Sequence, residues 1–265
     1  MRIQFRLLIA VALAACFSRA HAEAPAAIRV VDIPTRPGVT QRMIVLTPAA
    51  PKAAVVLLAG GHGGLQIAPD GSMKWGAGNF LVRSRQLFAE QDLAVAVVDA
   101  PSDQQAPRFL EYFRTTSAHV ADLKAVIAWM RDTTGLPVWL IGTSRGTQSA
   151  AYAATQLAGA DAPDGIVLTS SILSDRSSLP VTAMALRDIR IPVLVVHHRQ
   201  DGCALCAFSG VSFLMGKLDN APRKQLLAFE GGVSTGDPCG AYAHHGYNGL
   251  EPEVARQIAA WIAAK

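Results

Sequence analysis

Short apolar runs alternate with segments of helical periodicity along most of the chain, starting near residue 27. The first two runs are rich in β-branched residues and are separated by the turn-forming segment 34–38, which predicts a leading hairpin or meander. The later runs are mostly apolar throughout, as strands of a buried parallel sheet are. The predicted strands are 28–31, 42–46, 53–58, 93–98, 137–141, 165–169, 192–197 and 225–229.

Helical segments connect these strands, and the hydroxyls of residues 115–117 can cap the second of them. The predicted helices are 80–90, a segment through 120–130, 145–157, 210–218 and a C-terminal helix with Val254, Ile258, Trp261 and Ile262 on one face. Three polar side chains on these helices are expected to be exposed to solvent: Arg83, Arg85 and His119. The alternation predicts an α/β fold with a mostly parallel sheet of about eight strands and helices on both faces.

No internal repeat or linker divides the chain, so we expect a single domain over residues 23–265. Two longer segments without periodicity, 60–78 and 231–249, each follow a predicted strand. Open α/β sheets bind ligands beyond the carboxyl ends of their strands, so both segments are expected on the side of the sheet where ligand sites lie.

The first 22 residues have the pattern of an export signal. Arg2 and Arg6 form a positive segment, residues 7–15 are apolar, and Ala20-His21-Ala22 is a small-x-small cleavage site. The apolar run is too short to span a bilayer, so we expect an exported protein, periplasmic or secreted, cleaved after Ala22. A second interpretation stays open, because residues 13–16 resemble a lipobox in which Cys16 carries a lipid anchor.

Removal of this leader changes the charge of the protein. The net charge falls from +4 to +1, because three arginines and no acidic residue leave with the leader. No basic run remains, so nucleic acid is not an expected partner. With 51% hydrophobic and 17% charged residues, the composition indicates a packed globular protein.

Three cysteines remain after cleavage: Cys203, Cys206 and Cys239. In an oxidising compartment, two of them are expected to form a disulfide. Three pairings exist, and the spacing alone does not choose among them.

The pentapeptide Gly-Thr-Ser-Arg-Gly at 142–146 joins a predicted strand to a predicted helix. This is the context of a nucleophile elbow, in which a serine sits in a strained backbone conformation. Side chains at the flanking positions would clash with the strand and the helix, and Gly142 and Gly146 remove those clashes. The positive end of the helix favours a developing anion near the serine. We therefore predict that Ser144 is a nucleophile.

At these residues the chain resembles the α/β-hydrolase family, over nearly its whole length from about residue 27. In that family an acid and then a histidine follow the nucleophile along the chain. The resemblance implies Asp201 as the acid, because it follows a predicted strand and precedes a glycine, with Asp175 as the alternative. It implies His245 as the base rather than His244, because His245-Gly246-Tyr247 resembles the family's His-Gly-aromatic signature.

An oxyanion hole needs two backbone N–H donors aimed at the reacting oxygen. The resemblance implies one donor from Arg145, the residue after the nucleophile, and one from the glycine-rich loop 59–64. In this loop Gly61 is the first choice and His62 the second. The loop resembles, without matching, the His-Gly-Gly-Gly loop of some esterases, and no Gly-Lys-Ser/Thr follows it as in a phosphate-binding loop.

A group of metal-ligand residue types also follows the strand 192–197: His197, His198, Asp201, Cys203 and Cys206. In an exported protein a disulfide is favoured over a zinc site for such cysteines. The implied fold brings the loops of Cys203 and Cys239 together and favours that pair. We therefore expect neither a metal nor a cofactor.

The expected function is the hydrolysis of a small-molecule ester through a Ser-His-Asp triad and an acyl-enzyme intermediate. Only about twenty residues separate Thr169 from Ile191, where many relatives insert a lid, so we expect an open site and no large cap domain. The nearest likeness is to small lidless carboxylesterases similar to dienelactone hydrolases, which use a cysteine where this chain has Ser144. Two alternatives stay open: a peptidase or amidase on the same triad, and a binding protein that keeps the fold without catalysis.

Overall fold

The computed structural model describes residues 27–264 of the chain. The predicted export signal, its cleavage after Ala22 and the alternative lipid anchor on Cys16 lie outside these residues and stay predictions. Within residues 27–264, no helix is both long enough and apolar enough to cross a membrane.

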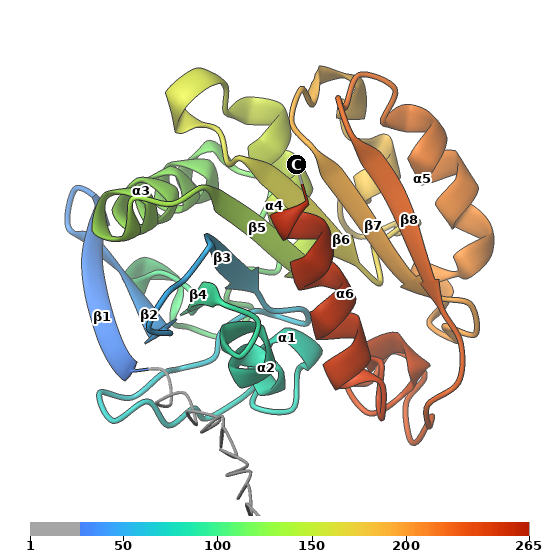
Figure 1. The fold of residues 1–265 in the computed structure, drawn as a ribbon, viewed down its shortest axis with the longest axis horizontal. Coiled ribbons are helices and arrows are strands. Elements are labelled where there is room, and N and C mark those ends of the chain that lie inside the picture. The colour runs from blue at the N-terminus through green and yellow to red at the C-terminus, as the bar shows by residue number, and fades with distance from the viewer. Residues whose placement is uncertain (1–26, 265) are drawn as a thin grey trace, which may run out of the picture.

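The described strands form one eight-stranded sheet (Figure 1). They are β1 (Ala27–Arg36), β2 (Val39–Thr47), β3 (Ala53–Leu58), β4 (Leu93–Val98), β5 (Val138–Thr143), β6 (Gly165–Thr169), β7 (Val193–His198) and β8 (Lys224–Phe229). Their order across the sheet is β1-β2-β4-β3-β5-β6-β7-β8. The β1–β2 and β2–β4 pairs are antiparallel, and the other neighbouring pairs are parallel. The predicted mostly parallel α/β sheet is therefore confirmed.

The leading hairpin is present, but its strands are longer than predicted. β1 continues to Arg36 and β2 begins at Val39, so the turn uses residues 37–38 instead of 34–38. β1 tolerates Pro34 because it is an edge strand, where a missing N–H donor leaves no partner unpaired. The strand register shifts between Pro34 and Arg36.

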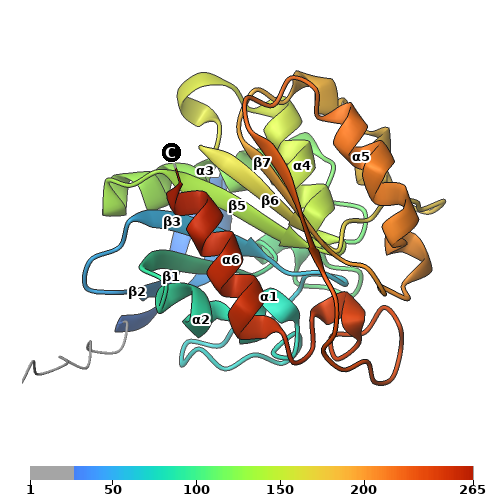
Figure 2. The ribbon, with the colours of Figure 1, turned by 45° about the vertical axis from the view of Figure 1, so that its right-hand side comes forward.

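Helices cover both faces of the sheet (Figure 2). They are α1 (Phe80–Arg83), α2 (Arg85–Ala89), α3 (Ser117–Thr134), α4 (Gly146–Gln156), α5 (Val211–Lys217) and α6 (Glu251–Ala263). Helices α3, α4 and α5 pack on one face, and α1, α2 and α6 pack on the other. Side chains of β3 alternate between the two faces of the sheet. Val56 and Leu58 pack in the apolar cluster with α3, α4 and α5, and Val55 and Leu57 pack in the cluster with α1, α2 and α6.

The helix predicted over 80–90 is two short helices that meet at Ser84. Ser84 has φ −88° and ψ 2°, which takes it out of the helical conformation. The break redirects the chain so that Phe80 and Phe88 are both buried against the sheet. The apolar spacing alone does not reveal this break.

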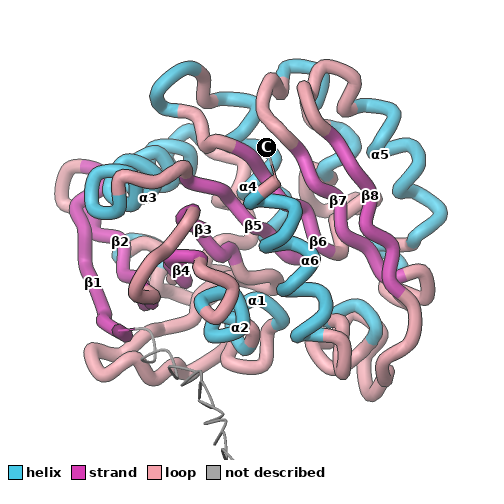
Figure 3. The backbone as a smooth tube through the Cα atoms, in the orientation of Figure 1, coloured by secondary structure: helices cyan, strands magenta, loops and turns pink. Residues whose placement is uncertain are grey.

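Between the α-helices and strands, the chain forms short 3₁₀ turns and loops (Figure 3). The turns are Ser102–Gln104, Gly159–Asp161, Val181–Ala183, Leu186–Asp188, Ala204–Cys206, Phe208–Gly210 and His244–Gly246. The connection from β6 to β7 contains two of these turns and no α-helix, so it carries no large cap domain. The aperiodic segments 60–78 and 231–249 begin beyond the carboxyl ends of β3 and β8.

The expectation that His119 is exposed was wrong. The residue is 3% exposed, and its Nε2 shares a hydrogen bond of 2.9 Å with the hydroxyl of Ser149 on α4. Burial lowers the pKa of His119 to about 3, so the imidazole is neutral. No local pattern indicates that His119 is buried, because its partner Ser149 lies 30 positions away along the chain.

Candidate active site

Ser144 lies in a sharp turn between β5 and α4. Its φ is +51°, a conformation that non-glycine residues rarely adopt. The Ser144 N–H donates to the Thr169 carbonyl at 3.0 Å, and the Thr147 N–H and hydroxyl donate to the Ser144 carbonyl at 2.9 and 2.6 Å. These bonds hold the strained residue at the carboxyl end of β5, as in a nucleophile elbow.

Gly142 and Gly146 allow the strand and the helix to approach each other at this turn. A Cβ on Gly142 would lie 2.3 Å from the Gly146 carbonyl oxygen, and a Cβ on Gly146 would lie 2.0 Å from the Leu58 carbonyl oxygen. Both distances are far below van der Waals contact, and the contacted atoms are backbone atoms that cannot rotate away. The turn therefore requires glycine at both positions.

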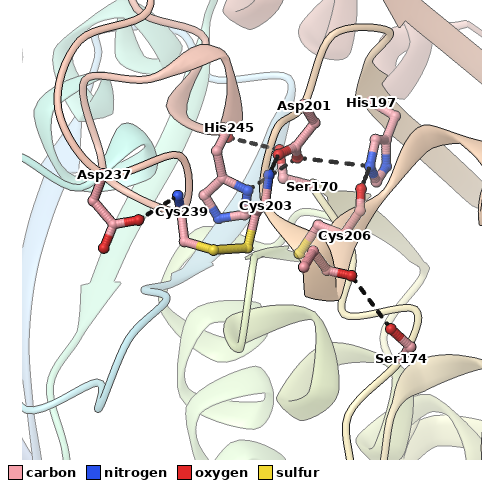
Figure 4. The surroundings of a disulfide bond; sticks show 10 residues. Ser170, Ser174, His197, Asp201, Cys203, Cys206, Asp237, Cys239 and His245 are labelled. Carbon is pink, nitrogen blue, oxygen red and sulfur yellow. Dashed lines mark hydrogen bonds and ion pairs between the residues drawn. A yellow bond between two sulfur atoms is a disulfide. The ribbon is translucent and has the colours of Figure 1, made fainter.

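His245 and Asp201 meet from the loops that follow β8 and β7 (Figure 4). The Nδ1–H of His245 donates to Asp201 Oδ2 at 2.9 Å, and the other carboxylate oxygen accepts the Cys203 N–H at 2.9 Å. The Asp201 side chain is fully buried, and His245 Nε2 has no hydrogen-bond partner in the described part of the chain. A carboxylate thus orients one ring nitrogen, and the other is left for a reacting group.

Ser170 and Tyr247 fix the backbone of the His245 loop. The Ser170 hydroxyl donates to the His245 carbonyl at 2.7 Å, and the Tyr247 hydroxyl donates to the Val196 carbonyl at 2.8 Å. Tyr247 is fully buried, and burial raises the pKa of its phenol, which therefore stays a hydrogen-bond donor. Sequence reasoning noted Tyr247 only as part of a signature and missed Ser170, whose sole signal was a serine directly after a buried strand.

His244 has a different environment from its neighbour His245. Its ring stacks on that of His198, with centroids 4.3 Å apart, and its Nδ1 lies 3.3 Å from the Gln200 carbonyl oxygen. His198 in turn donates from Nε2 to the Gly231 carbonyl at 3.0 Å. The structure brings His245, and not His244, to a carboxylate.

Asp175, the alternative acid, is engaged elsewhere. It accepts hydrogen bonds from Arg145 Nη1 at 2.9 Å and from the Ser178 hydroxyl at 2.5 Å. Burial raises the pKa of Asp175, but hydrogen bonds from Ser178, Ser177 and Arg145 outweigh this effect and hold the pKa below its usual range. Asp175 therefore anchors the Arg145 side chain.

On the expectation from the sequence that His245 is the general base of an ester hydrolase, Asp201→Asn should lower the kcat of ester hydrolysis by about 10⁴-fold, because an amide would not hold His245 in the productive tautomer. Asp175→Asn is the matched control and should retain most of the activity. Both are measured as p-nitrophenyl acetate turnover, with far-UV circular dichroism as the check on folding. The reverse order of the two losses would assign the acid role to Asp175.

A cavity of about 290 Å³ has Ser144 and His245 in its wall. Segment 60–78 lines one side with residues that include Gly60 and Trp75, and segment 231–249 contributes Cys239 among others. The lining includes no Asp, Glu, Lys or Arg side chain. The two segments singled out by their lack of periodicity thus enclose one apolar and largely uncharged site.

A larger hollow of about 440 Å³, beside Arg42 and Asp99, includes none of the predicted site residues. The Asp99 carboxylate there accepts backbone N–H groups, among them those of Leu65 and Ile67 at 2.7 and 2.8 Å. Asp99 therefore holds the loop that follows β3 in place.

The glycine-rich loop passes directly beside Ser144, because a Cβ on Gly60 would lie 3.0 Å from the Ser144 Cβ. Within residues 27–264, the backbone N–H groups of Gly61, His62 and Arg145 have no hydrogen-bond acceptor. The His62 ring stacks between two aromatic rings, with centroids 3.9 Å from Trp75 and 4.5 Å from Phe109. Of the three predicted oxyanion donors, Gly61 lines the cavity, and His62 and Arg145 directly follow lining residues along the chain.

Cys203 and Cys239 form a disulfide, which is the pairing favoured from the sequence (Figure 4). The bond joins the loop that carries Asp201 to the loop that carries His245. Residues 231–239 are exposed, so few buried contacts hold this part of the loop in place. The disulfide adds a covalent link to the hydrogen bonds that hold this part of the loop, among them that from the Val233 N–H to the Asn248 carbonyl.

Cys206 is a free and buried cysteine beside this disulfide. Burial raises the pKa of its thiol above the usual range, which keeps it protonated. Its sulfur and ligand atoms of Cys203 and His245 lie within 4.8 Å of one another, but the Cys203 sulfur is occupied by the disulfide. The Cys206 carbonyl accepts a hydrogen bond from His197 Nε2 at 2.6 Å, so His197 has a structural partner.

Arg83 links the two loops that line the cavity. The expectation that its side chain is exposed to solvent was therefore wrong. Its Nη1 donates to the Gly78 carbonyl at 2.5 Å and its Nη2 to the Gly246 carbonyl at 2.7 Å. The guanidinium also pairs with Glu251 at 2.7 Å, and its side chain is 17% exposed. The neighbouring Arg85 is half-buried and donates to the Val82 carbonyl.

No family model matches the chain, and no curated protein matches it in sequence. Among solved structures, a dienelactone hydrolase from Anabaena variabilis is similar, with TM-score 0.64 and 16% identity over 90% of this chain and 98% of that one. An esterase from Pyrococcus furiosus gives TM-score 0.63 and 13% identity over 89% and 92% of the two chains. A cold-adapted esterase from an Arctic intertidal metagenomic library gives TM-score 0.55 and 18% identity over 81% and 88%. With the sheet order and the helical layers described above, these likenesses show that this chain has the α/β-hydrolase fold.

Proposed function

We propose that this protein is a serine esterase that hydrolyses small carboxylic esters. The observation that carries the proposal is the buried His245–Asp201 pair. His245 Nδ1 lies 2.9 Å from Asp201 Oδ2, and His245 Nε2 has no partner in the described residues. His245 and Ser144 both line the cavity. The solved structures of the same fold named above are an esterase from Pyrococcus furiosus, a cold-adapted esterase and a dienelactone hydrolase, which supports ester chemistry.

In the acylation half-reaction, the Ser144 hydroxyl oxygen attacks the ester carbonyl carbon and its proton passes to His245 Nε2. The carbonyl π-electrons move onto oxygen, and N–H groups of Arg145 and of Gly61 or His62 bind the resulting oxyanion. The tetrahedral intermediate collapses as the C–O bond to the alcohol breaks, and His245 returns the proton to the leaving oxygen. Asp201 holds the imidazole and stabilises its charged form throughout.

In the deacylation half-reaction, water replaces the alcohol. His245 Nε2 takes a proton from water as its oxygen attacks the acyl-enzyme carbonyl. The second tetrahedral intermediate releases the carboxylic acid and returns the proton to Ser144. These steps require no cofactor.

The cavity favours a small and uncharged acyl group. Its volume of about 290 Å³ is at the lower end of the range of about 300–1,000 Å³ for small-molecule sites. A charged acyl group would meet no opposite charge in the lining, so it would lose its hydration without compensation.

A panel of p-nitrophenyl esters graded by acyl length tests the proposal. The highest kcat/KM is expected for acetyl to butyryl esters, with a decrease of at least about tenfold for the decanoyl ester, since long chains exceed the cavity. A hemisuccinyl ester should be slower than the neutral butyryl ester of similar length. Hydrolysis of p-nitroanilides faster than the matching esters would instead indicate an amidase, and turnover of neither would leave a binding protein.

We further infer that the protein is exported to the periplasm or secreted. The inference rests on the leader pattern of residues 1–22, and a disulfide in the folded domain supports it, since such bonds persist in oxidising compartments. Cleavage after Ala22 is the favoured processing, with lipidation at Cys16 as the alternative. A small-molecule ester is the partner proposed.

A further inference from the structure

Arg114 is a buried cation without a buried anion beside it. The residue is 3% exposed, and in the described part of the chain its guanidinium pairs with no carboxylate. Nη1 donates to the Ser149 hydroxyl at 2.9 Å, and Nη2 donates to the carbonyls of Ala59 at 2.9 Å and Gly61 at 3.1 Å. Nε has no partner within residues 27–264.

This burial is energetically unfavourable, because buried charges are normally neutralised by an ion pair. Burial, and then the nearby positive charge of Arg145, lower the pKa of Arg114 to about 9. The guanidinium therefore stays protonated at neutral pH. Among residues 27–264, no carboxylate balances the positive charge that the fold keeps at this position.

Ser149 and His119 do not supply the missing negative charge. His119 shares a hydrogen bond with the Ser149 hydroxyl, and its pKa of about 3, lowered by burial, makes it neutral at physiological pH. The other partners of Arg114 are neutral carbonyls. A neutral donor could satisfy such groups, so hydrogen bonding alone does not account for the charge.

The carbonyls that Arg114 holds belong to the loop beside Ser144. No peptide bond in residues 27–264 is cis, so the N–H of each following residue points opposite to the carbonyl before it. With the Ala59 and Gly61 carbonyls turned toward Arg114, the N–H groups of Gly60 and His62 point away from the guanidinium. Both amides lack an acceptor in the described residues, and Gly60 lines the cavity with Ser144.

The loop also leaves room for the guanidinium. A Cβ on Gly63, where φ is +77°, would lie 2.5 Å from Arg114 Nη2. Glycine at this position therefore allows the Arg114 guanidinium to reach the carbonyl oxygens of Ala59 and Gly61.

We propose that Arg114 is a positioning residue for the oxyanion hole. Its guanidinium orients the 59–60 and 61–62 peptide planes, which carry the N–H groups of Gly60 and His62. Its unpaired charge is balanced when the tetrahedral intermediate becomes negative. The inference rests on the proposed function, since it requires acyl transfer at Ser144. Because the charge is balanced in the transition state and not in the resting enzyme, Arg114 lowers the activation barrier more than it strengthens substrate binding.

Three variants test this role. Arg114→Met removes the charge and the donors at similar length, and Arg114→Lys keeps the charge. Ser149→Ala is the matched control, because it removes one bond of Arg114 and leaves its bonds to the loop intact. For each protein, kcat and KM are measured with p-nitrophenyl acetate, together with the dissociation constant of phenylboronic acid, which forms a tetrahedral anion on a nucleophilic serine.

Arg114→Met should lower kcat by about 10²- to 10³-fold, the loss typical of an oxyanion-hole donor, with KM changed by less than about threefold. Its affinity for the boronic acid should fall by a similar factor. Arg114→Lys keeps the charge but not the forked donors, so its kcat should fall by less than that of Arg114→Met, and Ser149→Ala should be close to wild type. A folded Arg114→Met with wild-type kcat and boronate affinity, or with a loss confined to KM, overturns the proposal, as does an equal loss in Ser149→Ala.

If Arg114→Met does not fold, Arg114→Lys decides the question. The proposal then requires kcat and boronate affinity to fall together at constant KM, and a change in KM alone, or a variant equal to wild type in both, overturns it. A wild type that neither hydrolyses esters nor binds the boronic acid overturns the proposed function and this inference with it. An active wild type with an equally active Arg114→Met overturns only the role of Arg114.

Discussion

Ser144→Ala is expected to lower kcat for p-nitrophenyl acetate by about 10⁴- to 10⁶-fold and to abolish labelling by a fluorophosphonate probe. Alanine keeps the backbone of the turn but removes the hydroxyl oxygen that is proposed to form the acyl-enzyme. Residual hydrolysis would then come from the oxyanion-hole donors and from binding alone, with water as the nucleophile. The measurements are initial rates and the mass of the probe adduct on the intact protein.

Ser171→Ala is the matched control for this substitution. Ser171 is a buried serine on the loop after β6, and its hydroxyl has no hydrogen-bond partner in the described part of the chain. Its loss should leave both turnover and labelling close to wild type. Labelling that persists in Ser144→Ala and disappears in another serine variant would place the nucleophile elsewhere.

The sequence predicted the parts of the fold that depend on local patterns. Each strand of the parallel core is an apolar run. The order strand, glycine, serine, glycine, helix at 142–146 predicts the sharp turn, because only glycines tolerate the contacts at 2.3 and 2.0 Å. The meeting of Asp201 and His245 also follows from the parallel topology, because β7 and β8 are adjacent and parallel. Successive strands deliver their loops to the same edge of the sheet.

Other features depend on contacts between distant segments, which a local pattern does not contain. The residues that bury His119 and Arg114 include Ser149, which is 30 and 35 positions away along the chain. Arg83 is bound to Gly246 and Glu251 across more than 160 positions. Such side chains resemble ordinary surface charges in the sequence, and only their tertiary partners reveal that they support the walls of the cavity.

The two adjacent histidines also differ in a way that depends on contacts between distant segments. Sequence resemblance favoured His245 over His244, but both lie on one loop, and the spacing alone would admit either. The structure separates them by their partners: His245 meets a fully buried carboxylate, while His244 stacks on His198. Only the first arrangement leaves a ring nitrogen that is both oriented by an acid and unpartnered on its other side.

His245→Ala is therefore expected to lower kcat by about 10⁶-fold, comparable to loss of the nucleophile, because the two residues act as a unit. His244→Ala, its matched control, should lose little activity, since it removes only a stacking contact and a long hydrogen bond of 3.3 Å to Gln200. Added imidazole should restore part of the turnover of His245→Ala, since it can occupy the space beside Asp201, and should not restore Ser144→Ala. A greater loss in His244→Ala than in His245→Ala would exchange their roles, and the hydrogen bond at 2.9 Å would then be structural.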